Sequence, residues 1–350
     1  MKIAQVAPLI ESVPPQYYGG TERVVSYLTE ELVRQGHEVT LFASGDSITS
    51  ARLVPIVERA LRLNPDHPEP MAYHSIMLGR LAKQAQQFDI IHFHIDILQF
   101  PLHYYLPIPS VTTLHGRLDL PDLGEVYHEF GQVPLISISN HQRTPLLFAN
   151  WQATVYNGVP MDTYHFNARP QGYLAFLGRI SPEKGIEAAI EIAIRAGLPL
   201  KIAAKVDKVD EEYYQQRIKP LLQHPLVEYI GEICEQEKDE FLGNAKAVLF
   251  PINWPEPFGL VMNESFACGT PVIAFNRGSV PEVMQDGETG FVVSGIDAAV
   301  DAVEKIDTIS REYCRYLFEQ RYSSAVMAKN YLHAYESVIN GRHYQAPIAV

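Results

Sequence analysis

Cysteine is scarce in this sequence: only Cys234, Cys268 and Cys314 occur among its 350 residues. None of them forms a C-x-x-C pair, so neither a zinc site nor a disulfide framework is expected. The chain also has no apolar run of about 20 residues and no apolar signal core near Met1. These absences predict no membrane-spanning helix and favour a cytoplasmic location.

Basic residues are in the minority, since 28 Lys and Arg stand against 41 Asp and Glu, for a formal net charge of -13. Such a surface repels nucleic acid and anionic lipid, so no nucleic-acid partner is expected. An anionic substrate would have to be held by a few local cations. The length suits two domains of about 150 residues each.

The turn after the first predicted strand departs from the G-x-G-x-x-G pattern, so an NAD site is not expected. Residues 2–8 predict a strand, residues 21–36 an amphipathic helix with Thr21 as its N-cap, and residues 38–43 a second strand. This order predicts a parallel sheet. Gly19 and Gly20 precede the helix, where their missing side chains let a phosphate or sugar approach the backbone; a flexible turn is the alternative.

Two later strands end in histidine. His92, His94 and Asp96 alternate along a predicted strand and its exit, residues 88–96, so they would share one face. A metal site is one interpretation, but no complementary ligands are evident, and packing with a polar edge is favoured. His115 follows the predicted strand 109–114, at the end where open α/β sheets bind ligands.

Residues 254–275 carry the most informative pattern. The prolines in 254–257 exclude a helix there, whereas apolar residues recur at helical spacing between Gly259 and Gly269, and a buried strand follows. Glu256 thus lies in a loop before a helix N-terminus, and Glu264 lies about two turns further on. Unpaired N–H groups there favour anionic or hydroxyl-rich ligands. A capped, solvated helix is the alternative.

A second loop, 178–185, offers two cations. Ser181 is predicted to cap a helix that starts at Pro182, which places Arg179 at a strand end and Lys184 at a helix N-terminus, facing one crevice. A guanidinium and an ammonium beside unpaired N–H groups suit a diphosphate. Two solvated surface cations are the alternative.

These motifs resemble those of glycosyltransferase family 4 (glycosyl transferases group 1), retaining enzymes of the two-domain GT-B type that use nucleotide sugars. The resemblance rests on E-x7-E from Glu256 to Glu264 with Ala-Cys-Gly-Thr-Pro-Val after it, on Gly-Arg-x-x-x-x-Lys-Gly from Gly178, and on Leu-His-Gly from Leu114. It implies an α/β fold of two facing Rossmann-like domains with parallel sheets and an interdomain cleft. The acceptor-side domain would span 1–166, joined by a helix at about 320–340, and the donor domain 167–319.

The resemblance also implies residue roles. Glu256 would accept hydrogen bonds from donor-sugar hydroxyls, Arg179 and Lys184 would stabilise the leaving diphosphate, and His115 would support the sugar; these four are the expected catalytic residues. Further donor contacts are expected from seven residues, namely Gly19, Gly20, Phe258, Gly259, Leu260, Glu264 and Ile233. Among these, Glu264 would bind the ribose, and Ile233 belongs to the strand exit against which the base would lie.

The implied reaction transfers a hexosyl unit from a nucleotide-diphosphate sugar to an acceptor hydroxyl with retention, which gives an α-glycoside. The chain has no D-x-D, the metal–diphosphate motif of the other large glycosyltransferase fold, so neither a metal nor another cofactor is expected. The nucleotide base, the sugar and the acceptor (a saccharide, lipid or small molecule) stay open, and a lipid acceptor would bring peripheral membrane contact. The alternatives are a nucleotide-sugar epimerase or phosphorylase on the same fold, or a non-catalytic sugar-nucleotide-binding protein.

Overall fold

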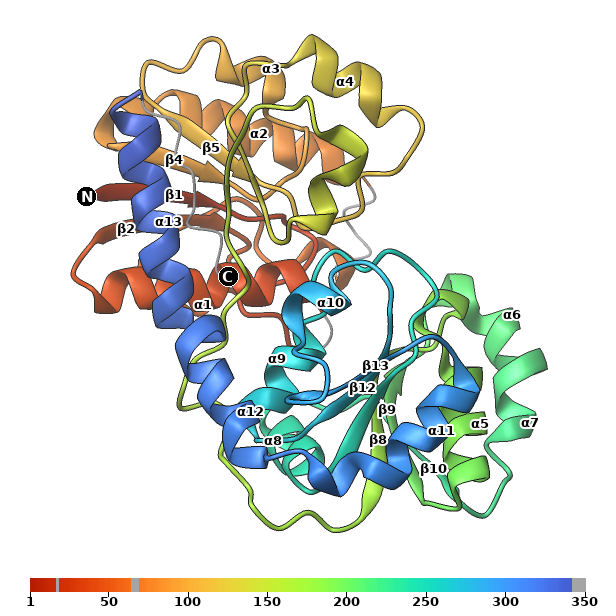
Figure 1. Ribbon diagram of the computed structural model, residues 1–350. Helices are drawn as coiled ribbons and strands as arrows, with labels where there is room; N and C mark the ends of the chain where they lie inside the picture. The colour runs from red at the N-terminus through yellow and green to blue at the C-terminus, as the bar shows by residue number, and fades with distance from the viewer. Residues whose placement is uncertain (17–18, 64–68, 342–350) are drawn as a thin grey trace. The chain divides into compact units, whose positions relative to one another are not determined.

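The computed structural model describes residues 1–16, 19–63 and 69–341, and it divides the chain into two compact units. Unit 1 is Met1–Gly158 together with the chain from Ser324 onward, and unit 2 is Val159–Ser323. In each unit, helices cover both faces of one parallel sheet (Figure 1). The predicted fold class, an α/β protein with two Rossmann-like sheets, is confirmed.

Unit 1 is centred on a seven-stranded sheet of order β3-β2-β1-β4-β5-β6-β7, in which all neighbouring strands pair in parallel. The strands are β1 (Lys2–Val6), β2 (Glu38–Ala43), β3 (Arg52–Pro55), β4 (Ile90–Phe93), β5 (Ser110–Thr113), β6 (Leu135–Ser137) and β7 (Trp151–Thr154). The order reverses between β1 and β4. Ligands of open α/β sheets bind at such a reversal, outside the carboxyl ends of the strands.

The helices of unit 1 cover two chemically different faces of its sheet. They are α1 (Gly20–Arg34), α2 (Pro70–Ala82), α3 (Phe100–His103), α4 (Leu123–Glu129) and α13 (Ser324–Ile339). On one face, Ala4 and Val6 pack in an apolar cluster with Met77 of α2. On the other face, α1 and α13 lie side by side (Figure 1), and Gln5 and His92 point to α13. The two-residue period of the strands separates these sets.

Unit 2 is centred on a six-stranded sheet of order β10-β9-β8-β11-β12-β13, again with parallel pairing throughout. Its strands are β8 (Tyr173–Arg179), β9 (Leu200–Lys205), β10 (Val227–Gly231), β11 (Ala245–Phe250), β12 (Val272–Phe275) and β13 (Gly290–Val293). Its helices are α5 (Ile186–Ala196), α6 (Glu211–Tyr213), α7 (Lys219–Leu221), α8 (Glu235–Gly243), α9 (Leu260–Ala267), α10 (Val280–Val283), α11 (Ile296–Lys305) and α12 (Arg311–Leu317). Across the part of the chain that the structure describes, none of the helices is long and apolar enough to cross a bilayer.

Two predicted helix caps are wrong. Helix α1 starts at Gly20 with Gly19 as its N-cap, so Thr21 is already helical. Ser181 precedes only a 3-10 turn, Pro182–Lys184, and its side chain makes no capping hydrogen bond. Helix α5 starts after Gly185, whose φ of 73° interrupts the helical path that the prediction continued from Pro182. Glycine adopts this left-handed conformation without the steric cost that other residues pay.

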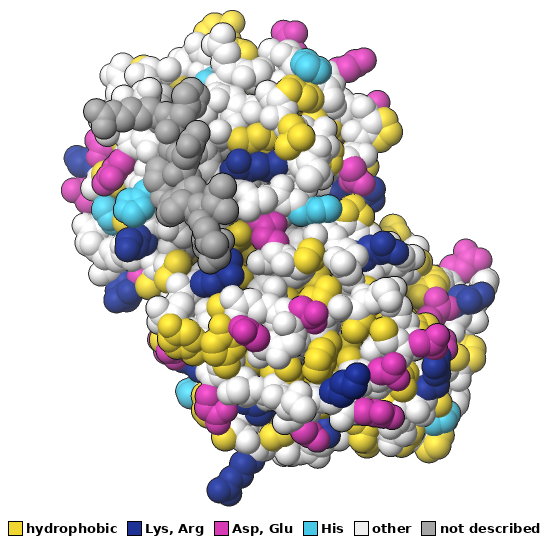
Figure 2. Space-filling model, viewed as in Figure 1, with side chains coloured by type: hydrophobic (Ala, Val, Ile, Leu, Met, Phe, Trp, Pro, Cys, Tyr) yellow, Lys and Arg dark blue, Asp and Glu magenta, His cyan; other side chains and the backbone are white. Residues whose placement is uncertain are grey.

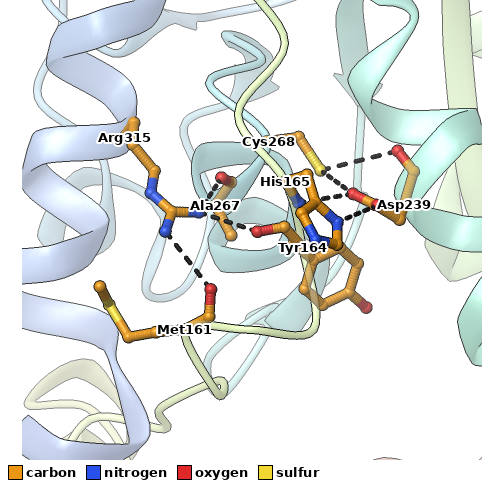
Figure 3. A network of polar contacts seen from close by, with 7 residues as sticks. All are labelled: Met161, Tyr164, His165, Asp239, Ala267, Cys268 and Arg315. Carbon is orange, nitrogen blue, oxygen red and sulfur yellow. Dashed lines mark hydrogen bonds and ion pairs between the residues drawn. The ribbon is translucent and has the colours of Figure 1, made fainter.

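The first segment of unit 2 is fastened to α9 and α12 by the polar network of Figure 3. The Arg315 guanidinium donates to three backbone carbonyls, those of Met161, Tyr164 and Ala267, at 3.3, 2.9 and 2.7 Å. His165 Nδ1 lies 2.6 Å from Asp239 Oδ2 of α8. The neighbouring Cys268 thiol is buried, which raises its pKa well above the usual range. Cys268 therefore keeps its proton, and its thiol donates to Asp239 Oδ1 at 3.7 Å.

Arg311 of α12 also donates to several backbone carbonyls, and this yields a prediction about stability. It is 9% exposed, and it donates to the carbonyls of Asn167, Gly243 and Ala245 at 2.6, 2.8 and 3.0 Å. We expect Arg311→Met to lower the free energy of unfolding by about 3 kcal/mol, because it leaves several buried acceptors without a donor.

Urea unfolding measures this change. The matched control is Arg195→Met, which removes an arginine whose partners, Glu191 and Asp297, lie on the exposed surface. We expect no clear shift of its unfolding midpoint. Equal shifts for the two variants would contradict the role given to Arg311.

Candidate functional site

The candidate site of unit 2 lies at the carboxyl edge of its sheet, where the strand order reverses between β8 and β11. Arg179 is the last residue of β8, and the loop that leaves β11 carries Trp254 and Glu256. The loop ends at Gly259, the N-cap of α9. Because the strands run parallel, both loops leave the sheet at the same edge.

A buried ion pair joins two of the predicted catalytic residues. Lys184 Nζ lies 2.5 Å from Glu256 Oε2, and Trp254 Nε1 donates to the same oxygen at 2.9 Å. The ammonium also lies over the Trp254 ring, 5.1 Å from its centroid. The Lys184 and Glu256 side chains are only 13% and 11% exposed, so water and salt screen their charges weakly. The pair therefore fixes both side chains.

Close backbone contacts bring the two loops together. A Cβ on Gly185 would come within 2.0 Å of the Pro251 carbonyl oxygen, so only glycine fits there. Next to this contact, the Asn253 amide donates to the Glu183 carbonyl at 2.8 Å. The 3-10 turn that carries Lys184 is thus docked on the loop that carries Glu256.

A third loop supports Glu256 from the other side. Gly278 has φ 55°, and a Cβ on it would lie 2.4 Å from the backbone N and O of Glu256. The Ser279 amide donates to the Glu256 carbonyl at 3.0 Å, and its hydroxyl donates to the Phe258 carbonyl at 2.8 Å. Phe258 is itself buried. These contacts set the backbone from Glu256 to the start of α9.

Arg179 is held differently from Lys184. Its guanidinium pairs with Glu183 at 2.9 Å and with Asp207 at 3.4 Å, and its side chain is 25% exposed. Asp207 also pairs with Lys205 at 3.0 Å, and these cations together lower the pKa of Asp207 against the effect of its burial. Acidic neighbours therefore orient Arg179 at the carboxyl end of β8.

Glu264 lies on α9 and is tied to α8. Lys238 Nζ lies 2.9 Å from Glu264 Oε1 and 3.4 Å from Glu235 Oε2. Glu264 is buried, with 3% of its surface exposed. Ile233, which lies two residues before the start of α8, is half-buried in the connection from β10. Lys238, a residue that the sequence analysis missed, therefore ties Glu264 of α9 to Glu235 at the start of α8.

In unit 1, the predicted catalytic His115 belongs to a histidine cluster. His115 Nε2 lies 2.9 Å from His94 Nδ1, and His94 Nε2 lies 2.7 Å from Gln5 Oε1. The His92 and His94 rings are 3.9 Å apart, as the alternation predicted. Strand β4 ends at Phe93 and Asp96 has φ 53°, so the alternating pattern stops before Asp96.

Burial keeps these histidines neutral. It lowers the pKa of His115 to about 4 and lowers the pKa values of His92 and His94 well below the usual value. The ring nitrogens of His92 and His94 bond to protein groups. Among residues 1–16, 19–63 and 69–341, no three His, Cys, Asp or Glu side chains are grouped as metal ligands.

The glycine pair of unit 1 lies at the N-terminus of α1. Gly19 adopts φ 169°, and a Cβ on it would approach Pro15 Cβ at 2.8 Å. Gly20 is the first residue of the helix. The packing of Gly19 against Pro15 is a reason for glycine at this position that does not require a ligand.

Comparisons with known proteins assign the chain to a family. A family model described as Glycosyltransferase Family 4 matches residues 18–159, and a model described as Glycosyl transferases group 1 matches residues 165–322. The chain belongs to glycosyltransferase family 4.

Relatives of this glycosyltransferase match it over most of its length. A glycogen synthase of Mycobacterium tuberculosis is 26% identical, with 83% of each chain covered, and a phosphatidyl-myo-inositol mannosyltransferase of Mycobacterium leprae is 25% identical, with 97% of each covered. A glycosyltransferase involved in avilamycin A biosynthesis has a TM-score of 0.77 at 22% identity, covering 98% of this chain and 99% of that one. Anabaena HepE, solved with UDP-glucose, has a TM-score of 0.71 at 17% identity, covering 96% and 100%. The fold is GT-B.

The surface of the glycosyltransferase fits its acidic composition. On the face drawn in Figure 2, Lys and Arg side chains are scattered among acidic and apolar ones. The cations of the candidate site are instead positioned by acidic partners, with Lys184 held by Glu256 and Arg179 by Glu183. Specific pairing, and not a general positive surface, is what places positive charge at this edge.

Gly278 yields a prediction that separates backbone strain from loop displacement. Alanine at Gly278 or at Gly287 would adopt a positive φ, 55° or 78°, but only the Cβ at 278 meets other atoms. We expect Gly278→Ala to reduce sugar transfer by the glycosyltransferase roughly 100-fold, because Glu256 must move. Gly287→Ala should cost only about 1 kcal/mol of stability. Transfer rates and urea midpoints for both variants test this, and equal losses of transfer would refute it.

The histidine cluster predicts how stability depends on pH. In the unfolded chain His115 titrates near 6.5, and in the folded chain near 4, so between these values the unfolded state binds more protons. Stability is therefore full above pH 6.5 and falls as the pH drops towards 4, with at most roughly 3 kcal/mol from His115. Urea midpoints at pH 7, 5.5 and 4.5 measure the slope. The slope should be smaller in His115→Gln; an unchanged slope would argue against a neutral His115.

Proposed function

We propose that this glycosyltransferase moves a hexosyl unit from a nucleotide-diphosphate sugar to an acceptor hydroxyl, with retention of configuration and without a metal ion. The buried pair of Lys184 and Glu256 at the edge of the unit 2 sheet carries the proposal. Glu256 Oε2 is shared by Lys184 and Trp254, so Oε1 is the oxygen that accepts hydrogen bonds from sugar hydroxyls. Lys184 supplies positive charge where a leaving diphosphate becomes more negative.

The N-terminus of α9 is the proposed cradle of the donor. Backbone N–H groups of Phe258, Gly259 and Leu260 lie at the N-terminal end of the helix, where the helix dipole is positive and favours an anionic ligand. The structures of Anabaena HepE with UDP and with UDP-glucose support a nucleotide sugar as the donor class. A starch synthase IV of Arabidopsis thaliana solved with ADP shows that the base varies among structural neighbours, so the base is left open here.

The nucleoside end of the donor is assigned to α8 and the end of β10. Glu264 accepts hydrogen bonds from ribose hydroxyls, and Lys238 holds its Oε1 in place. Ile233 offers an apolar surface to the base. Gly19 and Gly20 are proposed to border the donor from unit 1. These assignments of donor contacts to individual residues rest on the family resemblance.

In the proposed reaction, the bond between the anomeric carbon and the diphosphate oxygen breaks while the acceptor oxygen bonds to that carbon on the same face. The acceptor proton passes to the leaving phosphate, so atoms and charge balance. Arg179 and Lys184 stabilise the diphosphate in place of a metal ion. His115 contacts the sugar near the reacting carbon. The product is an α-glycoside.

The acceptor and location are the least specific parts of the proposal. The acceptor is a saccharide, a lipid or a small molecule with a free hydroxyl, and a lipid would require transient membrane contact. A cytoplasmic site of action is proposed because nucleotide sugars are the donors. Loops of unit 1 are expected to determine which acceptor binds, because proteins that share a fold differ mainly in the loops that carry their binding residues.

Two experiments test the proposal: binding of a panel of nucleotide sugars, and removal of the Lys184 charge. Thermal shifts with UDP, GDP and ADP sugars should single out one donor, since a ligand at 100 times its Kd stabilises by about 2.7 kcal/mol. With that donor and EDTA present, we expect Lys184→Met to lower kcat/KM roughly 100-fold. The control is Lys219→Met, which removes an exposed lysine of α7. It should transfer normally.

Several outcomes would overturn parts of this proposal. Loss of turnover in EDTA that manganese restores would exclude the metal-free route. An inverted product by NMR would exclude retention. Epimer formation from the donor without any acceptor would favour an epimerase. Donor binding with no transfer to any acceptor would leave a binding protein.

A further inference from the structure

A continuous row of hydrogen-bonded side chains runs between the sheet of unit 1 and α13. In order, its members are His115, His94, Gln5, Tyr335, His92, Thr113 and Tyr331. All are buried except the half-buried His115, which lies at the carboxyl end of β5. The row thus connects the candidate catalytic histidine to the interior of the unit.

Gln5 determines the direction of the bonds that lead to His115. Its amide has two distinct ends: Oε1 lies 2.7 Å from His94 Nε2, whereas Nε2 donates to the Tyr335 hydroxyl at 3.1 Å. A carbonyl oxygen only accepts, so His94 Nε2 carries the ring proton and His94 Nδ1 is an acceptor. His115 Nε2 lies 2.9 Å from that Nδ1, so His115 carries its proton on Nε2.

The other half of the row agrees with this direction. The Tyr335 hydroxyl accepts from Gln5 and therefore donates to His92 Nδ1 at 2.7 Å. His92 Nε2 then donates to Thr113 Oγ1 at 2.7 Å, and that hydroxyl donates to the Tyr331 hydroxyl at 3.1 Å. Each inner member donates once and accepts once, so a turn of the Gln5 amide would reverse every bond.

We propose that this row holds His115 in the Nε2–H tautomer and presents its Nδ1 lone pair at the carboxyl edge of unit 1 as a hydrogen-bond acceptor. Gln5 and Tyr335 are then positioning residues that act through His94. The identity of the group that His115 meets, a hydroxyl of the donor sugar, rests on the proposed function. The inferred tautomer of His115 does not depend on the proposed function.

The tautomer has a consequence for specificity. A ring nitrogen that can only accept requires a hydrogen-bond donor opposite it, and a hydroxyl meets this need. Fluorine cannot donate. A donor sugar with fluorine in place of the contacted hydroxyl should therefore bind as weakly as the deoxy sugar, roughly 3- to 10-fold below the parent. With the opposite tautomer, fluorine would keep part of the contact.

NMR of the ligand-free protein tests the tautomer directly. In 15N-histidine-labelled protein, the protonated and unprotonated ring nitrogens have well-separated shifts, and we expect His115 to be protonated on Nε2. Tyr335→Phe should add the second tautomer, because Gln5 Nε2 loses its acceptor and the amide can turn towards His94. The control, Tyr127→Phe, removes a buried hydroxyl of the same unit outside the row and should leave the spectrum of His115 unchanged.

Gln5→Glu is the second variant. Both oxygens of a carboxylate accept, so either orientation of the new side chain accepts from His94 and His115 should keep its tautomer. This test does not depend on whether the Tyr335→Phe protein folds. A wild-type His115 protonated on Nδ1 would overturn the proposal. So would a Tyr335→Phe protein that keeps a single Nε2–H tautomer. The expected tautomer in a protein that binds no nucleotide sugar would instead refute the proposed function and leave the row intact.

Discussion

The candidate site depends on one constraint of parallel sheets: every strand delivers its carboxyl end to the same edge. In unit 2 the strand order reverses between β8 and β11, so the loops after these strands border one location. The buried pair of Lys184 and Glu256 then joins the two loops. Because both ions are largely withdrawn from water, removing either would leave an uncompensated charge, and the pair holds the loops in one arrangement.

Glycine makes this arrangement possible. Gly185 lies against the Pro251 carbonyl and Gly278 against the backbone of Glu256, at distances that no Cβ would allow. Both also have positive φ. The acidic and basic side chains of the site are therefore positioned by backbone packing first and by their own pairing second. In unit 1, we infer the corresponding role for the row that leads from Tyr335 of α13 through Gln5 and His94 to His115.

Much of this was predictable from local pattern. The first strand (predicted at 2–8 and observed at 2–6), the α9 helix after Gly259 and the alternation of His92 with His94 follow from apolar periodicity and proline placement. The helix after Ser181 was predicted correctly except for its start, which lies at Ile186 because a close contact between Gly185 and a strand exit about 65 residues later interrupts the helical path. Lys238 was missed for a related reason: a lysine on an acidic helix has no local signal until α9 places Glu264 beside it.

The sequence alone determined the fold class and the kinds of side chain that could hold a nucleotide sugar, because strand and helix periods and motif spacing are local properties. Tertiary structure alone decided which charges pair. It pairs Lys184 with Glu256, Arg179 with Glu183 and Asp207, and Lys238 with Glu264. It also decided the tautomer that we infer for His115, since that depends on Tyr335, distant in sequence. Such pairings require segments far apart in the chain to meet, and no local pattern encodes that meeting.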